Sequence, residues 1–321
     1  MKRKYQPVDP SRLKTFSIHQ RAHKSETGAF AGLPQPGATA AELIRSLPRF
    51  LGAEEFRAIV EATVAAHRAG RPVVWALGAH VIKVGCSPIV VDLIERGIIT
   101  AVALNGAGPI HDAEIAMIGQ TSEEVADTIR TGQFGMVDET AALFRQALDR
   151  PAIAEEGLGR ALGQALLDAG APNIGYSILA TARRADVPLT VHVAVGTDTV
   201  HMLPEVDGAK LGAATMTDFR IICDVVGDMA AAEGSPVGGV WYNIGSAVVL
   251  PEVFLKAVAV ARNLGADLES MHAANFDMIR HYRPGQNVVT RPVAPGHGHQ
   301  IVGQHEILLP LLRQALIEEL S

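Results

Sequence analysis

Two consecutive segments of this chain, residues 73–97 and 99–119, share one pattern. Each has a short apolar run rich in Val and Ile, then a polar turn that contains glycine, then a helix-like stretch. Parallel strands need long crossover connections, usually helices, and are buried on both faces. The pattern therefore predicts two strand–turn–helix units of a parallel sheet. Open α/β sheets bind ligands at the carboxyl ends of their strands, so the polar turns predict a small-molecule site.

The rest of the chain continues this alternation. Apolar runs predict further strands over 189–195, 239–244 and 267–274, and helical periodicity is present over 38–46, 53–69, 209–232, 251–264 and 304–320. Residues 121–124 resemble a capping box that opens a helix. We predict a three-layer, Rossmann-like α/β fold, with a mostly parallel sheet and helices on both faces.

The domain organisation follows from composition along the chain. Residues 1–38 are rich in Pro, Gly and basic side chains and lack periodicity, so we interpret them as an irregular arm available for packing on a neighbouring subunit. No polar linker divides the remainder, and residues 39–321 are predicted to form a single α/β domain.

Charge and cysteine content limit the possible partners. The net charge is −6, which gives no basic surface for nucleic acid or for anionic membranes. No apolar run reaches the roughly 20 residues of a spanning helix. The two cysteines, Cys86 and Cys223, lie far apart and suggest neither disulfides nor a thiolate cluster. We expect a cytoplasmic protein with a small-molecule substrate.

Small and polar residues end one predicted strand after another. These sets are Gly78–Ala79–His80, Asn105–Gly106–Ala107–Gly108, Gly196–Thr197–Asp198, Asn243–Ile244–Gly245–Ser246 and Ala273–Ala274–Asn275. Small residues let a ligand approach the backbone, and amides at helix starts can hold phosphate. The row favours a pyrophosphate-containing cofactor, although G-x-G-x-x-G and Walker A sequences are absent.

Histidines supply candidates for proton transfer. His111 beside Asp112 and His201 near Asp198 could each form an imidazole–carboxylate pair with a pKa close to working pH. Imidazole and carboxylate donors also suit zinc, iron or manganese, so a metal-dependent hydrolase or lyase is the alternative hypothesis. No histidine spacing matches a strong metal motif, and we predict no metal ligands.

Four segments resemble the deoxyhypusine synthase superfamily over about residues 70–285. They read GAHVIKVG, NGAGPIHD, AVGTDTVHM and NIGSAVVLPEVFLKAVAVARNLGADLESMHAANFD. The resemblance implies a Rossmann-like sheet, bound NAD, and a tetramer with sites at subunit interfaces. It also implies transient oxidation of spermidine and transfer of its aminobutyl group to a lysine.

Individual residues carry the resemblance unevenly. Residues 105–108 resemble the family's Thr-Ala-Gly-Gly cofactor loop, Asp112 matches an acidic position there, and Thr197–Asp198 match a Thr-Asp pair near the nicotinamide. Residues 263–267 and 273–277 resemble further family segments. The family's paired glutamates are replaced by Ile110–His111, and Glu252 stands where a histidine falls.

The family's imine-forming lysine is absent. The stretch that should hold it, residues 281–306, contains arginines and no lysine, and arginine stays protonated and cannot act as the amine nucleophile. Lys83 and Lys256 are the possible substitutes. We therefore expect a reaction other than hypusine formation.

Taken with this resemblance, the sequence predicts a deoxyhypusine synthase-like, NAD-dependent transferase or oxidoreductase that forms a homotetramer or homodimer. It would act by hydride transfer on a small amine-bearing or related polar substrate such as a polyamine. The predicted catalytic residues are His111, His201, Asp198, Glu252 and Lys83. The predicted cofactor-binding residues are Gly78, His80, Asn105, Gly106, Ala107, Gly108, Asp112, Thr197, Asp198, Asn243, Gly245, Ser246, Ala273, Asn275 and Asp277. A non-catalytic NAD-binding protein is a further alternative.

Overall fold

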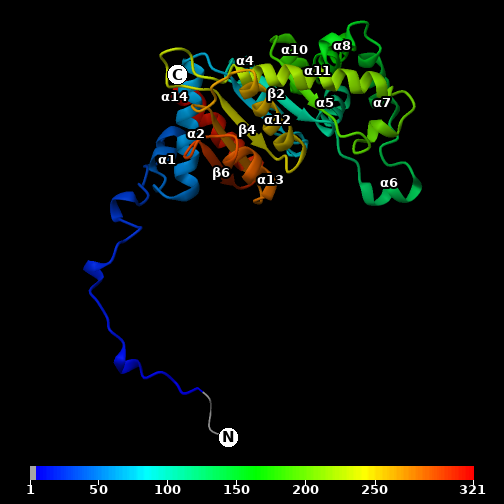
Figure 1. Ribbon diagram of the computed structural model, residues 1–321. Helices are drawn as coiled ribbons and strands as arrows, with labels where there is room; N and C mark the ends of the chain where they lie inside the picture. The colour runs from blue at the N-terminus through cyan, green and yellow to red at the C-terminus, as the bar shows by residue number, and fades with distance from the viewer. Residues whose placement is uncertain (1–4) are drawn as a thin grey trace.

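A computed structural model describes residues 5–321 of the chain, which form an α/β fold around one parallel sheet (Figure 1). The strands are β1 (Val73–Leu77), β2 (Ala101–Asn105), β3 (Leu189–His192), β4 (Val240–Ile244), β5 (His272–Asp277) and β6 (Gly298–Val302). Their order across the sheet is β3-β2-β1-β4-β5-β6, and all neighbouring pairs are parallel. The predicted fold class is confirmed.

Helices connect the strands. The α-helices are α1 (Ala40–Ser46), α2 (Leu51–Arg68), α3 (His80–Lys83), α4 (Ser87–Glu95), α5 (Ala107–Ile118), α6 (Val125–Thr131), α7 (Asp138–Leu148), α8 (Ile153–Glu156), α9 (Leu158–Asp168), α10 (Ile178–Arg184), α11 (Gly208–Gly227), α12 (Val249–Asn263), α13 (Tyr282–Pro284) and α14 (His305–Leu320). The remaining helical elements are five 3-10 turns and one π-helix. They are η1 (Pro10–Arg12), η2 (Ile18–Gln20), η3 (Thr27–Ala29), η4 (Ile174–Tyr176), η5 (Thr199–Met202) and the π-helix η6 (Gly285–Thr290). None of these helices is long and apolar enough to cross a bilayer.

The sheet has a hydrophobic core on each face. Along β1, Trp75 and Leu77 point into a cluster with α2, α4, α5 and α14, whereas Val74 and Ala76 point into a cluster with α11 and α12. This alternation is the two-residue period of a strand. The helices thus cover both faces and leave the strand ends for a ligand.

The strand order reverses between β1 and β4. From β1 the chain proceeds outward through β2 and β3, and it then returns to the other side of β1 with β4 and proceeds to β6. This is the order of dinucleotide-binding sheets, whose ligands bind beyond the carboxyl ends of the strands near the reversal.

Residues 5–38 extend away from the domain, with η1, η2 and η3 as their regular structure (Figure 1). Contact with the domain is made near the end of the arm: the Gly32 amide donates to the carbonyl of Ser46 at 2.8 Å, and the Arg49 amide donates to that of Ala29. The first four residues of the predicted arm lie outside the described residues.

Three local predictions were wrong. Strand β5 begins at His272 rather than Asp267, because Gly265 has a left-handed backbone (φ 99°) and Asp267 accepts the Glu269 amide in a turn. Strand β6 was missed. The expected capping box at 121–124 does not form, because Glu124 caps α6 instead.

A buried histidine gives the fold a testable pH dependence. Burial lowers the pKa of His192 to about 4, below its value of 6.5 in an unfolded chain, and its Nε2 lies 2.9 Å from Thr190 Oγ1. As pH falls below 6.5, His192 becomes protonated in the unfolded chain but stays neutral in the folded chain. The free energy of unfolding therefore decreases. Between pH 7.5 and 4.5 this contributes a loss of about 2 to 3 kcal/mol.

Urea unfolding of His192→Gln at these two pH values should show a pH dependence smaller by about 2 kcal/mol. The exposed His19 provides the control variant, His19→Gln, which should behave as the wild type. An unchanged pH dependence in His192→Gln would show that the histidine is not the cause.

Candidate functional site

A cavity of about 520 Å³ opens at the carboxyl ends of β2 and β3. Its wall comes from α3, from α5 and the loop that follows it, from the loop between α6 and α7, and from the segment after β3. It includes Lys83, Ala107, His111, Glu114, Thr121, Glu123, Phe134, Thr197 and Asp198. The volume lies within the range of small-molecule sites. The cavity therefore lies at the edge that the sequence predicted to bind a ligand.

The loop from β2 into α5 lies beside this site and contributes Ala107 to its wall. Asn105 ends β2, and its side-chain oxygen accepts the Gly108 amide at 3.1 Å, which shapes the turn into the helix. Gly106 is the N-cap of α5 and Ala107 lines the cavity. Small residues at the start of a twelve-residue helix leave backbone groups accessible to a ligand.

Asp198 packs directly against Gly106. A side-chain carbon at Gly106 would lie 1.9 Å from Asp198 Oδ2, so glycine is required for this contact. The Oδ2 atom is buried and has no hydrogen-bond partner among the described residues. Burial raises the pKa of Asp198, although His201 and Thr197 offset part of the increase. A buried carboxylate oxygen without a partner is costly, and a ligand that donates a hydrogen bond would satisfy it.

His201 supports Asp198 rather than the cavity. The Gly196 and Asp198 amides approach His201 Nδ1 at 3.1 and 3.2 Å, so this atom is an acceptor and Nε2 carries the proton. His201 Nε2 lies 3.7 Å from Asp198 Oδ2, and both side chains are buried. The predicted pairing of these two residues is thus present. Asp198 lines the cavity, and His201 lies behind it.

His111 lines the cavity but does not pair with Asp112. Its Nδ1 lies 2.6 Å from Thr121 Oγ1 and 3.7 Å from Glu114 Oε2. Glu114 and Thr121 were missed by the sequence analysis, although the i, i+3 spacing of His111 and Glu114 places both on one helix face.

The cavity is acidic overall. Glu114, Glu123 and Asp198 contribute carboxylates, and Lys83, at the end of α3, is the one lysine or arginine among the lining residues. Lys256 lies elsewhere, ion-paired with Glu252 on α12. This balance favours a ligand with a cationic or hydrogen-bond-donating group.

The predicted residues of β1 and β4 meet one another at the reversal of the sheet. The Gly78 amide donates to the Ile244 carbonyl at 2.8 Å, and a side chain at Gly78 would overlap the Gly245 carbonyl. Gly245 has φ 67° and faces the ring of His305, which also lies 5.7 Å from the ring of His80. These glycines therefore have a packing role that requires no ligand.

The predicted residues of β4 and β5 form a buried amide row. Asn243 Nδ2 donates to Asn275 Oδ1 at 2.7 Å and to the Ser246 carbonyl, and Asn275 Nδ2 donates to Gln300 on β6. Asp277 ends β5, and its Oδ1 accepts the Met278 amide. The row ties together the three strands on this side of the sheet.

Three further predicted residues also lie away from the cavity wall, whose predicted members are Lys83, Ala107, His111, Thr197 and Asp198. Ala273 is inside β5 and packs in the core, because the strand begins and ends later than predicted. The Asp112 carboxylate is fully buried at the start of α10, where it accepts from Ser177 Oγ (2.5 Å) and from the Ile178 and Leu179 amides. Glu252 is engaged by Lys256, by Arg283 Nε at 3.1 Å and by Asn287 Nδ2 at 2.8 Å.

The histidines do not converge on one point. His272, His297 and His299 stack at the amino ends of β5 and β6, while His80 and His305 lie beyond β1 and His111 lies on α5. Among residues 5–321, no group of three or more His, Cys, Asp or Glu side chains could hold a metal ion. The geometry gives no support to the metal-dependent alternative.

Gly106 provides a test of the packing at this site. Gly106→Ala places a side chain on Asp198 Oδ2 and should lower the free energy of unfolding by about 1 to 3 kcal/mol through overpacking. Gly212→Ala, on α11 with open space around the added carbon, is the matched control and should raise it by about 0.5 to 1 kcal/mol. Urea unfolding measures both, and a Gly106→Ala protein as stable as the wild type would contradict the geometry.

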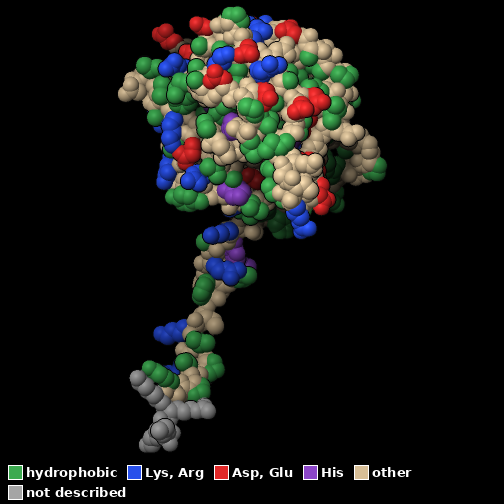
Figure 2. All heavy atoms as spheres, turned by 90° about the vertical axis from the view of Figure 1, so that its right-hand side faces the viewer, with side chains coloured by type: hydrophobic (Ala, Val, Ile, Leu, Met, Phe, Trp, Pro, Cys, Tyr) green, Lys and Arg blue, Asp and Glu red, His purple; other side chains and the backbone are tan. Residues whose placement is uncertain are grey.

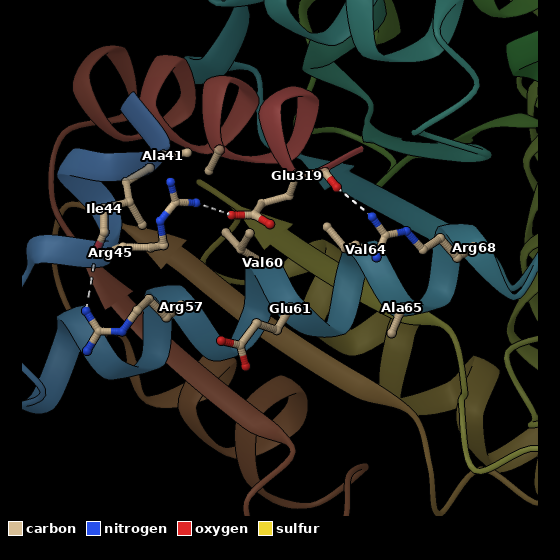
Figure 3. A pocket seen from close by; sticks show the side chains of 11 residues that line it. Ala41, Ile44, Arg45, Arg57, Val60, Glu61, Val64, Ala65, Arg68 and Glu319 are labelled. Atoms are coloured by element: carbon tan, nitrogen blue, oxygen red, sulfur yellow. Dashed lines mark hydrogen bonds and ion pairs between the residues drawn. The ribbon is translucent and has the colours of Figure 1, made fainter. Parts of the chain in front are cut away.

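A second cavity, of about 440 Å³, lies between α1, α2 and α14 (Figure 3). Its three arginines have partners: Arg45 Nη1 pairs with Glu319 Oε1 at 2.9 Å, Arg68 Nη2 donates to the Glu319 carbonyl, and Arg57 Nη1 donates to the Leu47 carbonyl. None of its lining residues follows a strand. The face of the molecule shown in Figure 2 carries interspersed acidic and basic side chains, without a single-sign patch.

Comparison with known proteins bears on the fold. No family model matches the sequence, and neither does any curated protein. ArgZ, an arginine dihydrolase from the ornithine–ammonia cycle in cyanobacteria, aligns with 82% of this chain at 15% identity and a TM-score of 0.50. AgrE in complex with ornithine and NAD⁺ aligns with 83% at 15% identity and a TM-score of 0.51. A putative deoxyhypusine synthase from Entamoeba histolytica aligns with 88% at 10% identity and a TM-score of 0.50.

The chain has the deoxyhypusine synthase-like fold. It spans 31% of the ArgZ chain and 33% of the AgrE chain, but 94% of the putative deoxyhypusine synthase. At such low identity the comparison establishes the deoxyhypusine synthase-like fold and leaves the reaction to be argued from the cavity.

Proposed function

We propose that this protein is an NAD-dependent enzyme that acts by hydride transfer on a small amine-bearing substrate in the cavity beyond β2 and β3. The observation that carries the proposal is the unpartnered Oδ2 of Asp198 in a cavity with three carboxylates and one lysine. An ammonium group supplies both the positive charge and the donors that this oxygen lacks. AgrE, a protein of the same fold, has been crystallised with ornithine and NAD⁺, which supports combining an amine substrate with this cofactor.

The residues of the cavity fit a dinucleotide, provided that no phosphate lies next to Asp198. The reversal of strand order and the small residues 106–108 at the start of α5 suit a dinucleotide, and Lys83 suits a phosphate. The Asp198 carboxylate against Gly106 would repel a phosphate at that point, so we assign it to a ribose hydroxyl or to the substrate's ammonium group. Bound NAD would supply the hydride acceptor.

The side chains of the cavity then have separate tasks. Asp198, held against Gly106 and backed by His201, binds and orients the substrate's cationic group. His111 accepts a proton from that group. Lys83 holds a phosphate. Glu252, which the sequence predicted to be catalytic, has no assigned part in this proposal because it is engaged by Lys256, Arg283 and Asn287.

A panel of amines tests the reaction. Full-length protein with NAD is incubated with ornithine, putrescine, spermidine or arginine, and the absorbance of the reduced cofactor is followed. We expect turnover with at least one amine, and no turnover with analogues in which a carboxyl group replaces the reacting amino group. Saturable NAD binding without turnover on any amine would instead favour a non-catalytic NAD-binding protein. The proposal includes a cytoplasmic homotetramer or homodimer, and light scattering would measure the assembly.

A further inference from the structure

Three side chains on the wall of the cavity form a hydrogen-bonded chain. His111 and Glu114 project from the same face of α5, and Thr121 comes from the loop after that helix. Thr121 Oγ1 lies 2.6 Å from His111 Nδ1 and also bonds Glu114 Oε2. The His111 and Glu114 side chains are only 18% and 20% exposed, so water competes weakly for these contacts.

The number of available protons fixes the direction of each hydrogen bond. An ionised carboxylate can only accept, and a threonine hydroxyl has one hydrogen to donate. Thr121 therefore donates to Glu114, and its oxygen must accept from His111 Nδ1. Because neutral imidazole carries one proton, His111 Nε2 keeps its lone pair, and it has no hydrogen-bond partner among residues 5–321.

The charge state of Glu114 agrees with this direction. Burial alone would raise the pKa of Glu114, but the nearby His111 and the hydrogen bond from Thr121 outweigh it and hold the pKa below its ordinary value. Glu114 is thus an acceptor at neutral pH, as the chain requires.

The backbone holds Thr121 in place at some cost. Gly119 ends α5 with φ 72°, and Ser122, on the other side of Thr121, also has φ 72°. Serine is uncommon in the left-handed region, and such strain persists where the surrounding structure imposes it. The loop geometry therefore serves to bring the Thr121 hydroxyl to the face of α5.

We propose that Glu114 and Thr121 are positioning residues that fix His111 in the Nδ1–H tautomer, which leaves Nε2 as the proton acceptor of the cavity. This rests on the proposed function for the identity of the proton donor, a substrate ammonium group. One N–H bond of that group breaks and one Nε2–H bond forms, so the substrate becomes a neutral amine and His111 becomes imidazolium. Its positive charge then lies beside the Glu114 carboxylate, 3.7 Å from Nδ1.

Nitrogen NMR of the full-length protein tests this without a substrate. Protein labelled with ¹⁵N-histidine is compared with His111→Gln, whose missing signals identify His111. We expect Nδ1–H and an unprotonated Nε2 at pH 7.5. Thr121→Val should shift the tautomer ratio roughly tenfold towards Nε2–H, as the loss of one hydrogen bond implies, and Thr121→Ser should restore it. Thr131→Val, an exposed change on α6, should leave the spectrum unchanged.

Wild-type His111 in the Nε2–H tautomer, or a Thr121→Val spectrum identical to that of the wild type, would overturn the proposal. Because the readout needs neither cofactor nor amine, it separates this proposal from the proposed function: the tautomer can be correct in a protein that oxidises no amine.

Discussion

Asp198→Asn is expected to lower kcat/KM on the active amine by about 100-fold or more while leaving the fold intact. The substitution keeps the shape of the side chain but removes the charge that binds an ammonium group. In the free protein Asp198 Oδ2 is buried without a hydrogen-bond partner, so losing its charge removes a cost rather than a stabilising contact. The melting temperature should therefore stay equal to that of the wild type or rise.

Steady-state kinetics on the amine identified by the panel, together with thermal melting, measure both effects. The matched control is Asp224→Asn, an exposed carboxylate on α11, which should change neither. Asp198→Asn protein with wild-type kcat/KM would remove Asp198 from the site. An equal loss of stability and activity would show that its role is structural.

Asp218→Ala is expected to lower the free energy of unfolding by about 3 kcal/mol or more. Asp218 lies on α11, fully buried, and its Oδ2 accepts the Gly159 amide at 3.0 Å and the Val191 amide at 2.7 Å. It thus connects the start of α9, strand β3 and helix α11. Its removal leaves the buried Gly159 and Val191 amides without this acceptor.

Urea unfolding measures this effect, with Asp224→Ala on the same helix as the control, expected to stay within about 0.5 kcal/mol of wild type. A loss below 1 kcal/mol in Asp218→Ala would contradict the assigned network. The carboxylate has a structural role although burial raises its pKa to about 7, a shift that resembles those of catalytic acids.

The fold was largely accessible from the sequence because its strands are short, apolar and regularly followed by helices. Strands β1 and β2 were identified from Val- and Ile-rich runs, and the resulting α/β class is correct. Strand β6, Gly298–Val302, was missed because glycine, His299 and Gln300 give it no apolar run. Strand β5 was predicted to begin at Asp267, but residues 267–271, Asp-Leu-Glu-Ser-Met, are mostly polar and precede the strand, which begins at His272.

The site was predictable where it depends on strand ends and not where it depends on side-chain direction. Ala107 and Asp198 follow β2 and β3, and topology alone brings them to one edge. Asp112 is only one residue from His111, yet the helix turns its carboxylate to α10, into the core. Thr121 reaches His111 through the left-handed turn at Gly119, which no local pattern indicated.

The central claim, a dinucleotide site beyond the carboxyl ends of this sheet, is tested most directly by thermal melting of ligand-free protein with NAD, with adenosine diphosphate ribose for comparison. A ligand that binds only the folded state stabilises it by about 2.7 kcal/mol at 100 times its Kd. We predict a saturable rise in melting temperature with NAD, and a smaller one with adenosine diphosphate ribose, which lacks the nicotinamide. No rise with either ligand up to millimolar concentrations would contradict the claim.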